Sequence, residues 1–260
     1  MVNILGVPFG GSSVPIIAGP CSIESKKQFL GLAQELQDMK VSFLRGGIYK
    51  LRTNPESFQG LGKAAYPIAQ EVSHATGLPF TAEVTDPRQI EELHEITSMF
   101  QVGTRNMYNY DLLKELGKSS KPVILKRAFS ATYGEFLNAA EYILAAGNKN
   151  VLLCERGIRT FVSDTRNTFD INAIPFLKNR TDLPVLADPS HGTGLTELVE
   201  PVALAALAAG ADGLIIEVHN DPKNALSDGQ QALTTAQFKS FLNKADQILN
   251  VLGRKLHERS

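Results

Sequence analysis

The chain has 260 residues, a formal net charge of −1 and two cysteines. This balance excludes a general electrostatic attraction to nucleic acid or to an anionic membrane, so any anion-binding site has to be local. Two cysteines cannot build a disulfide framework, no apolar run approaches the roughly 20 residues that span a bilayer, and the start of the chain lacks a secretory signal, so we expect a cytoplasmic protein.

The chain opens with two short alternating segments, residues 2–5 and 7–9, which predict a hairpin within residues 1–12. A series of strands and helices follows. Apolar strands are expected at residues 15–18, 41–44, 79–82, 99–102, 122–125, 151–154, 184–187 and 213–216. Helices are expected at residues 26–39, 57–76, 87–97, 110–116 and 133–146, from near residue 172, and at 195–209 and 235–252.

These eight strand–helix units run without a linker or a low-complexity segment between them. Continuous apolar strands, each followed by an amphipathic helix, indicate a parallel sheet covered on its outer face. Eight such units in a chain of this length predict an α/β fold of the closed (β/α)8, or TIM barrel, type. A doubly wound open sheet is the alternative. We expect one catalytic barrel domain over residues 1–260.

Polar residues follow nearly every predicted strand, and a barrel brings these strand ends to one rim. In chain order they are Cys21, Arg45, Glu83, Arg105, Lys126 with Arg127, Glu155 with Arg156, Asp188 with His191, and Glu217 with His219, followed further on by Asp228. The cations come mainly from the second, fourth, fifth and sixth strands, and the metal-ligand types from the first, seventh and eighth. The rim is therefore expected to carry the chemistry.

One thiol, one imidazole and two carboxylates, those of Cys21, His191, Glu217 and Asp228, form a mixed ligand set that suits a divalent transition metal. Taken singly, Cys21 could be a small buried apolar residue and His191 a hydrogen-bonding loop residue. Their joint position on one rim favours the metal site. Cys154 lies inside a strand and is interpreted as core.

The stretch of residues 45–55 combines two glycines with three cations and leads to Asn54 and Pro55, read as the start of a helix. Such a loop suits a phosphate or a carboxylate, although a flexible basic surface loop is the alternative. Arg105, Lys126 and Arg156 at neighbouring strand ends imply a second, multiply charged anion. The sequence has neither a dinucleotide fingerprint nor a phosphate-loop motif, which argues against a nucleotide cofactor.

With these residues in place, the chain resembles the family of 3-deoxy-D-arabino-heptulosonate 7-phosphate (DAHP) synthases. The resemblance is carried by residues 17–24, 45–62, 101–106, 153–161, 188–194 and 217–229. More narrowly, the chain is similar to the short single-domain branch that is related to 3-deoxy-D-manno-octulosonate 8-phosphate synthase. The resemblance implies a metal-dependent condensation of phosphoenolpyruvate with erythrose 4-phosphate, the first step of the shikimate pathway to the aromatic amino acids.

Carried over by motif, the resemblance assigns roles to the residues of the rim. It implies one divalent ion, Mn, Fe, Co or Zn, bound by Cys21, His191, Glu217 and Asp228. It implies phosphoenolpyruvate contacts at Arg45, Lys50, Arg105, Lys126 and Arg156, with Glu83 near the reacting carbon, and acceptor-phosphate contacts at Arg52 and Thr53. The residues with implied catalytic roles are Cys21, Lys50, Glu83 and His191.

One position departs from the family pattern, because Leu51 stands where relatives usually have proline between the lysine and the arginine. Leucine makes the stiffness of this loop, and with it the fit of the acceptor, an open question. The octulosonate branch, which uses arabinose 5-phosphate, usually has an Asn-Arg-Ser type sequence here. This chain lacks that sequence, which favours the four-carbon acceptor, with the octulosonate activity as the alternative.

Two other classes of function stay open at the sequence level. In a Schiff-base aldolase Lys126 would be the nucleophile, and in a non-catalytic anion-binding barrel the metal ligands would be unnecessary. By analogy with the family we expect a homodimer or homotetramer and no nucleic-acid or membrane partner. Because no regulatory or mutase domain is apparent, we also expect no feedback inhibition by phenylalanine or tyrosine.

Overall fold

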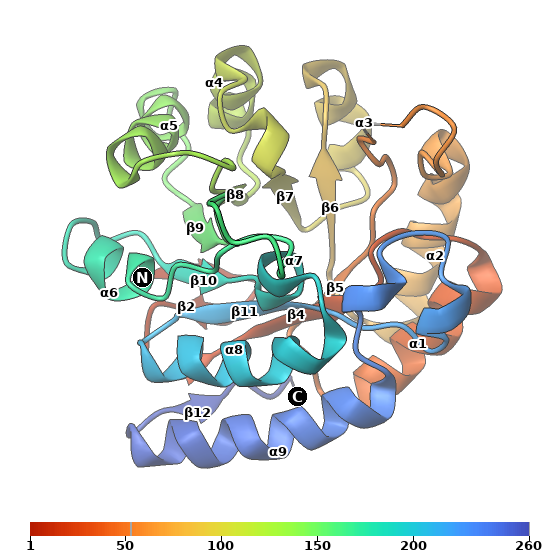
Figure 1. The fold of residues 1–260 in the computed structure, drawn as a ribbon. Helices are drawn as coiled ribbons and strands as arrows, with labels where there is room; N and C mark the ends of the chain where they lie inside the picture. The colour runs from red at the N-terminus through yellow and green to blue at the C-terminus, as the bar shows by residue number, and fades with distance from the viewer. Residues whose placement is uncertain (53, 260) are drawn as a thin grey trace.

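The structure is a computed structural model and describes residues 1–52 and 54–259. Eight parallel strands close into a barrel, in the spatial order β10-β11-β4-β5-β6-β7-β8-β9 (Figure 1). The barrel strands are β4 (Ile16–Gly19), β5 (Phe43–Arg45), β6 (Phe80–Val84), β7 (Met99–Val102), β8 (Val123–Lys126), β9 (Val151–Glu155), β10 (Val185–Ala187) and β11 (Gly213–Glu217). Closure confirms the predicted barrel, and the alternative of an open sheet is wrong.

Helices surround the strands, and α8 packs beside α9 on the outer face (Figure 1). The α-helices are α1 (Lys26–Asp38), α2 (Ala65–Thr76), α3 (Ile90–His94), α4 (Tyr110–Lys118), α5 (Tyr133–Ala145), α6 (Ala173–Lys178), α7 (Pro189–Thr193), α8 (Thr196–Ala208) and α9 (Thr235–Val251). Short 3-10 turns are η1 (Gly62–Ala64), η2 (Pro87–Gln89), η3 (Thr104–Asn106), η4 (Pro222–Asn224) and η5 (Gly229–Gln231). None of the described helices is both long and apolar enough to cross a membrane.

The predicted N-terminal hairpin is present as the antiparallel pair β1 (Val2–Ile4) and β2 (Val7–Phe9). Its apolar side chains belong to the same core cluster as the inward-facing residues of the barrel, among them Ile17 and Ile215. Phe9 is fully buried, and its ring lies 5.9 Å from that of Phe43 between the ring centroids. The hairpin therefore packs into one end of the barrel core, and the polar strand ends lie at the other.

A further pair of strands was not predicted from the sequence. β3 (Ser13–Val14) pairs in parallel with β12 (Lys255–Leu256), which follows α9. Two-residue strands have no periodicity that a sequence pattern could reveal. The pair ties the segment after the last helix to the segment that enters the first barrel strand.

Two of the predicted helices differ from the structure, and one helix was not predicted. The helix expected at 57–76 begins only at η1 and α2, because Gly60 and Gly62 have positive φ angles of 87° and 58° and interrupt a helical path. The helix expected at 87–97 is η2 followed by α3, which ends at His94. Conversely, the segment read as a loop after β10 contains α7, capped by the side chain of Asp188.

Candidate active site

The polar strand ends surround a cavity of about 170 Å³ at one end of the barrel. Six cationic side chains line it, namely Lys50, Arg52, Arg105, Lys126, Arg156 and Arg166, against the carboxylates of Glu83 and Asp228. His191 also lines it. An excess of cations in a concave site suits a multiply charged anion, as the sequence predicted.

A second cavity of about 30 Å³ adjoins the first and shares Lys50, Glu83 and His191 with it. Cys21 and Arg45 line only this smaller cavity. Its size suits a single ion or a water rather than a substrate. The strand ends thus form two compartments, a cationic one for an anion and a smaller one beside the thiol.

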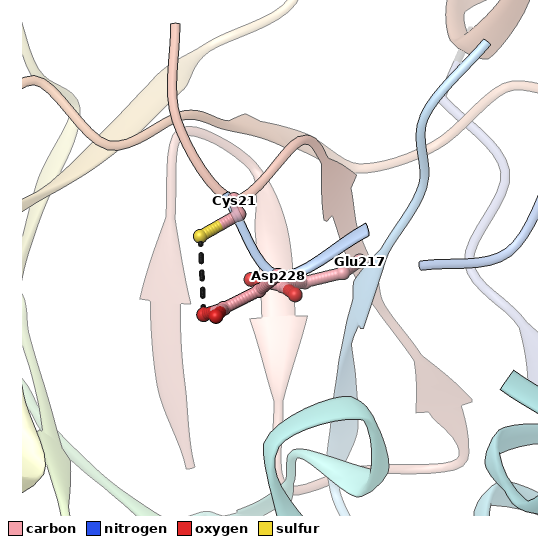
Figure 2. Close-up of side chains that lie close together, drawn as sticks. All are labelled: Cys21, Glu217 and Asp228. Carbon is pink, nitrogen blue, oxygen red and sulfur yellow. Dashed lines mark hydrogen bonds between the residues drawn. The ribbon is translucent and has the colours of Figure 1, made fainter. Parts of the chain in front are cut away.

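Ligand atoms of Cys21, Glu217 and Asp228 all lie within 4.8 Å of one another (Figure 2). The Sγ atom of Cys21 is 3.4 Å from Oδ2 of Asp228. These residues come from the segment after β4, the end of β11 and the loop that follows β11, so only the barrel brings them together. The structure therefore juxtaposes three of the four residues that the sequence proposed as metal ligands.

The loop that carries Asp228 is held against the loop that carries Cys21. The hydroxyl groups of Ser22 and Ser227 lie 2.9 Å apart and are buried, and the carboxylate of Glu24 accepts a hydrogen bond from the backbone N–H of Leu226 at 2.7 Å. Asp228 itself has a φ of 48°, in the left-handed region that only a few residue types adopt without strain. These contacts fix the carboxylate despite that backbone conformation.

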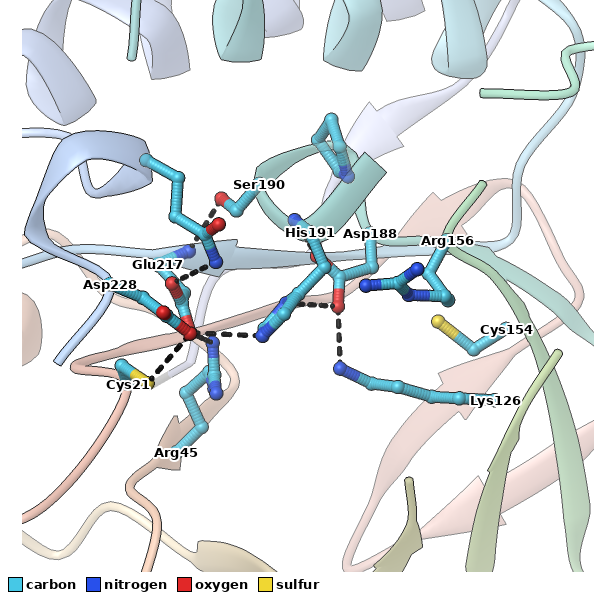
Figure 3. Close-up of polar contacts among 12 residues, drawn as sticks. Cys21, Arg45, Lys126, Cys154, Arg156, Asp188, Ser190, His191, Glu217 and Asp228 are labelled. Atoms are coloured by element: carbon cyan, nitrogen blue, oxygen red, sulfur yellow. Dashed lines mark hydrogen bonds and ion pairs between the residues drawn. The ribbon is translucent and has the colours of Figure 1, made fainter. Parts of the chain in front are cut away.

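His191, the fourth proposed ligand, lies on α7 and is oriented by Asp188 (Figure 3). One oxygen of Asp188 accepts from the backbone N–H of His191 at 3.0 Å, and the other lies 2.8 Å from Nδ1 of its ring. The second oxygen also accepts from Lys126 Nζ at 2.5 Å. Asp188 therefore sets the orientation of the His191 ring.

The protonation of this pair follows from its surroundings. Burial would raise the pKa of Asp188, but the charges of His191 and Lys126 outweigh it and hold that pKa well below the usual range. Burial lowers the pKa of His191 to about 4, against the opposing effect of Asp188. At neutral pH an ionised Asp188 accepts from Nδ1–H of a neutral His191, so Nε2 carries a lone pair.

This lone pair faces another acceptor, because Nε2 of His191 lies 3.3 Å from Oε1 of Glu217. Burial would raise the pKa of Glu217, but the charges of His191, Arg45 and Lys50 together lower it to about 2. Two acceptors this close repel each other unless a cation lies between or beside them. A thiol and a further carboxylate stand next to them, and this donor set fits a divalent transition metal.

Lys50 is the cation that contacts both the thiol and the Asp228 carboxylate of this set. Its ammonium contacts the Cys21 sulfur and lies 2.9 Å from Oδ2 of Asp228. Burial, followed by the nearby charge of Glu217, raises the pKa of Cys21 to about 11, so the thiol holds its proton. Binding of a metal ion would displace that proton, because the thiolate is the ligating form.

Arg45 and His191 both point at the carboxylate of Glu217 and contact the same oxygen, Oε1 (Figure 3). The guanidinium of Arg45 donates to Oε1 of Glu217 at 2.8 Å, and these two side chains are 7% and 0% exposed. Arg45, which lines the smaller cavity, therefore neutralises the buried carboxylate of Glu217. The resemblance had implied a phosphoenolpyruvate contact for it, and the larger cavity is not lined by Arg45.

The guanidinium of Arg156 is 2% exposed, and its Nε has no hydrogen-bond partner among the described residues. Burial lowers the pKa of Arg156 to about 10. Arg156 and Arg105 both lie over the ring of Phe129, at 5.2 and 5.7 Å from its centroid. A buried guanidinium whose Nε has no partner, and which lines the larger cavity, favours an anionic ligand there.

Glu83 lies between the two cavities and lines both. A Cβ atom added to Gly103 would lie 2.1 Å from Oε1 of Glu83. A glycine at this position leaves room for the carboxylate beside the β7 loop. The sequence placed Glu83 near the reacting carbon, and the structure places it between the cationic cavity and the thiol.

The proposed acceptor-phosphate residues are only partly described. Arg52 lies 3.7 Å from Oδ1 of Asp228 and lines the larger cavity beside Leu51, whereas Thr53 lies outside the described residues. The helix that the sequence placed directly after Asn54 is wrong. The side chain of Asn54 instead accepts a hydrogen bond from the backbone N–H of Glu56 in a turn. The backbone N–H groups of this turn therefore do not form the N-terminus of a helix.

Sequence reasoning missed three side chains of the site. Arg166 and Phe129 line the larger cavity, and the side chain of Gln231 donates a hydrogen bond to Glu217. Phe129 and Gln231 lie beyond the first residues after their strands, and Arg166 lies in the middle of the long segment between β9 and α6. An inspection of strand ends finds none of the three. The signal for Arg166 was a single cation in a polar loop, which has no distinctive pattern.

Comparisons with known proteins agree with one another. A family model described as the DAHP synthetase I family matches residues 6–252. A phospho-2-dehydro-3-deoxyheptonate aldolase of Thermotoga maritima is 42% identical over 257 residues, which cover 99% of this chain and 76% of that protein. A 2-dehydro-3-deoxyphosphooctonate aldolase of a Bradyrhizobium species is 31% identical over 258 residues, covering 90% of this chain and 88% of the relative.

Solved structures give the same picture. The crystal structure of the Thermotoga maritima phospho-2-dehydro-3-deoxyheptonate aldolase (DAHP synthase) superimposes with a TM-score of 0.96 at 43% identity, covering 99% of this chain and 76% of that one. A truncated form of the Thermotoga 3-deoxy-D-arabino-heptulosonate 7-phosphate synthase gives a TM-score of 0.92 at 40% identity, covering 99% and 95%.

Proposed function

The chain belongs to the DAHP synthetase I family and is a DAHP synthase, and we propose that it works with one divalent metal ion bound by Cys21, His191, Glu217 and Asp228. The reaction joins C3 of phosphoenolpyruvate to the aldehyde carbon of erythrose 4-phosphate. Water then adds at C2, and phosphate leaves by cleavage of the C–O bond. The relatives named for the octulosonate reaction are less similar to this chain, at 30–32% identity, than the Thermotoga DAHP synthase at 42%.

The observation that carries the metal proposal is the close approach of acceptors among the four proposed ligands. His191 Nε2 faces Glu217 Oε1 at 3.3 Å, beside the Cys21 thiol and the Asp228 carboxylate. A divalent ion bound there would act as a Lewis acid on the acceptor aldehyde. A ligand set that contains a thiolate, an imidazole and carboxylates suits Mn, Fe, Co or Zn.

The larger cavity is proposed to bind phosphoenolpyruvate by its carboxylate and phosphate. Arg105, Lys126 and Arg156 supply positive charge there, and the partner-free Nε of Arg156 supports an anion at that point. The cations orient the enol so that its C3 faces the acceptor, which lowers the entropic part of the barrier. Arg52, with Thr53 as an untested neighbour in the chain, is proposed to take the acceptor phosphate.

Lys50 and Glu83 are proposed to act next to the reacting atoms, since they line both cavities. Lys50 would leave Cys21 and Asp228 when these bind the metal, and its ammonium would then be available to the anionic substrate. Glu83 is positioned to exchange a proton with the water that adds at C2. His191 would be a ligand and not a free base, because its Nε2 lone pair would bind the metal ion while its Nδ1–H is held by Asp188.

A direct assay of product formation tests the substrate assignment. The purified chain is supplied with phosphoenolpyruvate, Mn²⁺ and either erythrose 4-phosphate or arabinose 5-phosphate, and the release of phosphate is followed. We expect turnover with the four-carbon acceptor and a kcat/KM at least an order of magnitude lower with the five-carbon one. A preference for arabinose 5-phosphate would establish the octulosonate reaction instead.

The Schiff-base alternative is disfavoured by the surroundings of Lys126. Its ammonium donates to the buried carboxylate of Asp188 at 2.5 Å, and a nucleophilic amine has to be unprotonated. Borohydride added during turnover should therefore trap no covalent adduct. A non-catalytic anion-binding barrel is disfavoured because the metal-ligand set is intact.

We further propose that residues 1–260 act as one catalytic barrel and that the chain assembles as a homodimer or homotetramer. Both proposals rest on the family relationship. Light scattering of the purified chain measures the assembly directly, and a monomer at micromolar concentration would contradict it. The expected cytoplasmic location likewise stays a prediction.

A further inference from the structure

Gln231 is a buried polar residue at the end of η5, three positions after Asp228. Its side chain is 0% exposed. The amide nitrogen donates to Oε2 of Glu217 at 2.6 Å, and the amide oxygen accepts from Arg166 at 2.5 Å. A buried amide with both ends bound costs little to bury, whereas one with a missing partner is destabilising.

The partners of this amide determine which way round it lies. A guanidinium can only donate, and an ionised carboxylate can only accept. The nitrogen therefore has to face Glu217 and the oxygen has to face Arg166. If the amide were flipped, its nitrogen would face the guanidinium of Arg166, donor against donor, and its oxygen would face the carboxylate of Glu217, acceptor against acceptor. Arg166 thus fixes the direction in which Gln231 donates.

The effect on Glu217 is to hold its carboxylate from two sides. Gln231 donates to Oε2, and Arg45 donates to Oε1 at 2.8 Å. With both donors in place the carboxylate has one orientation, in which Oε1 faces His191 at 3.3 Å. Loss of the Gln231 donor would free the carboxylate to rotate about its last bond.

Arg166 reaches the second acidic residue of the site as well. Its guanidinium lies 3.3 Å from Oδ2 of Asp228 and lines the larger cavity. The backbone of Arg166 is fixed, because its N–H donates to the carbonyl of Thr193 at 2.9 Å, and a Cβ on Gly194 would lie 2.4 Å from the Arg166 Cβ. One arginine therefore contacts both the Gln231 amide and the Asp228 carboxylate from the substrate side.

We propose that Gln231 is a positioning residue for the metal centre, that Arg166 fixes the orientation of its amide, and that together they set the directions of the Glu217 and Asp228 carboxylates. The inference rests on the proposed function, because it concerns residues proposed as metal ligands. It goes beyond that function in assigning roles to two residues outside the ligand set. Partners that orient metal-binding carboxylates typically change metal affinity by about 10- to 100-fold when they are removed.

The first experiment titrates Mn²⁺ alone into the metal-free full chain by calorimetry. Gln231→Met keeps the length of the side chain but removes both hydrogen bonds, and its dissociation constant for Mn²⁺ should rise by about 10- to 100-fold. The matched control is Gln230→Met, since Gln230 is the preceding residue on the same turn but is exposed. This control should bind Mn²⁺ as the unaltered chain does.

A purely structural role for Gln231 would lower the melting temperature of the metal-free chain and leave the affinity of the folded protein for Mn²⁺ unchanged. Gln231→Asn adds a second measurement, because its amide is one methylene shorter and cannot reach both partners. We expect it to resemble Gln231→Met. Mn²⁺ affinity within about twofold of the unaltered chain in both variants would overturn the proposal.

The second experiment changes Arg166, which lines the larger cavity. It therefore does not require the fold to tolerate a change at a fully buried position. Both contacts of Arg166 are made by the same nitrogen, Nη1. Arg166→Lys keeps a positive charge near Asp228, but its ammonium lies one atom short of Nη1 along the side chain and lacks the planar guanidinium that reaches the Gln231 amide oxygen. Because the charge is conserved, weaker Mn²⁺ binding would report the lost orientation of Gln231. An unchanged affinity would overturn the role given to Arg166.

The two levels of the proposal fail in different ways. If the unaltered chain binds no Mn²⁺, the metal centre and this inference are both wrong. If the unaltered chain binds Mn²⁺ and Cys21→Ala weakens that binding while Gln231→Met does not, the metal centre stands and only the positioning role is overturned.

Discussion

At the scale of single residues, the site is built from pairs in which one partner fixes the protonation or direction of the other. Asp188 binds Nδ1 of His191, which leaves the Nε2 lone pair facing Glu217. Such a carboxylate–histidine arrangement is typical of metal-binding histidines, because it fixes the tautomer and the ring orientation. Asp188 therefore supports His191 as a proposed ligand.

Replacing Cys21 tests the ligand set itself. Cys21→Ala should weaken metal binding by more than about tenfold, and most for softer ions such as Zn²⁺ and Co²⁺, because thiolate is the softest ligand in the set. Metal content after dialysis against each ion measures this. The matched control is Cys154→Ala, since Cys154 is the other buried cysteine but lies within β9. A Cys21→Ala chain with full metal content and full rate would refute the assignment.

Gly103 offers a test of Glu83 without changing Glu83. A methyl group at this position would stand 2.1 Å from the Glu83 carboxylate oxygen and push it aside. Because the carboxylate is the end of a flexible side chain, Gly103→Ala should leave the melting temperature nearly unchanged while lowering kcat by an order of 10²-fold.

The double variant with Glu83→Gln decides whether the effect of Gly103→Ala passes through Glu83. If it does, adding Gly103→Ala to Glu83→Gln should lower kcat no further, because the two changes affect the same group. Independent, multiplying effects on kcat would show that Gly103 acts in another way.

The sequence predicted the residue types at the rim better than their partners. Cys21, Glu217 and Asp228 were proposed as ligands from their places after strands, and they come together. The pairing of Arg45 with Glu217 was not foreseen, since opposite charges on distant strands have no local signature. Gln231 and Arg166 were also missed, because neither follows a strand directly.

At the scale of elements, the loops after the strands carry the chemistry, and their shape depends on contacts between loops. The Asp228 loop is held by the Ser22–Ser227 contact and by Glu24. The sequence predicted all eight strands, whose apolar runs are a strong signal, but misjudged the helix at 57–76. The prediction did not treat Gly60 and Gly62 as residues that end a helix, and a helical apolar pattern alone does not reveal such breaks.

The β3–β12 pair, which no pattern predicted, provides a pH test. The N–H of His257 donates to the carbonyl of Val14 at 3.0 Å, and its Nδ1 lies 3.1 Å from the Ser13 hydroxyl. Burial, with the nearby charges of Arg259 and Lys255, lowers the pKa of His257 below 6.5. The unfolded chain therefore takes up this proton at a higher pH than the folded chain does.

The sign of the pH effect follows from that difference. The His257 contribution to stability is fully present above pH 6.5 and is lost as the pH falls toward the pKa in the folded state. The free energy of unfolding of the unaltered chain, relative to His257→Gln, should decrease from pH 8 to pH 5 in denaturant titrations. A constant difference across this range would contradict the account.

At the scale of the whole molecule, closure of the barrel is what makes the site. Its proposed ligands span the chain from Cys21 to Asp228, and no local motif contains them all. The hairpin packs into one end of the barrel core, and the cationic cavity and the thiol-lined cavity lie among the strand ends and loops at the other. The rhythm of eight strand–helix units was sufficient to predict this architecture, because each unit has a strong apolar period.

The central claim is that this DAHP synthase depends on a divalent metal ion bound by Cys21, His191, Glu217 and Asp228. The most direct test measures the rate of the purified chain with phosphoenolpyruvate and erythrose 4-phosphate after treatment with EDTA and again after addition of Mn²⁺. The account predicts that activity is lost with the chelator and restored by the ion, with one ion bound per chain. Full activity in a chain shown to contain no metal would contradict it.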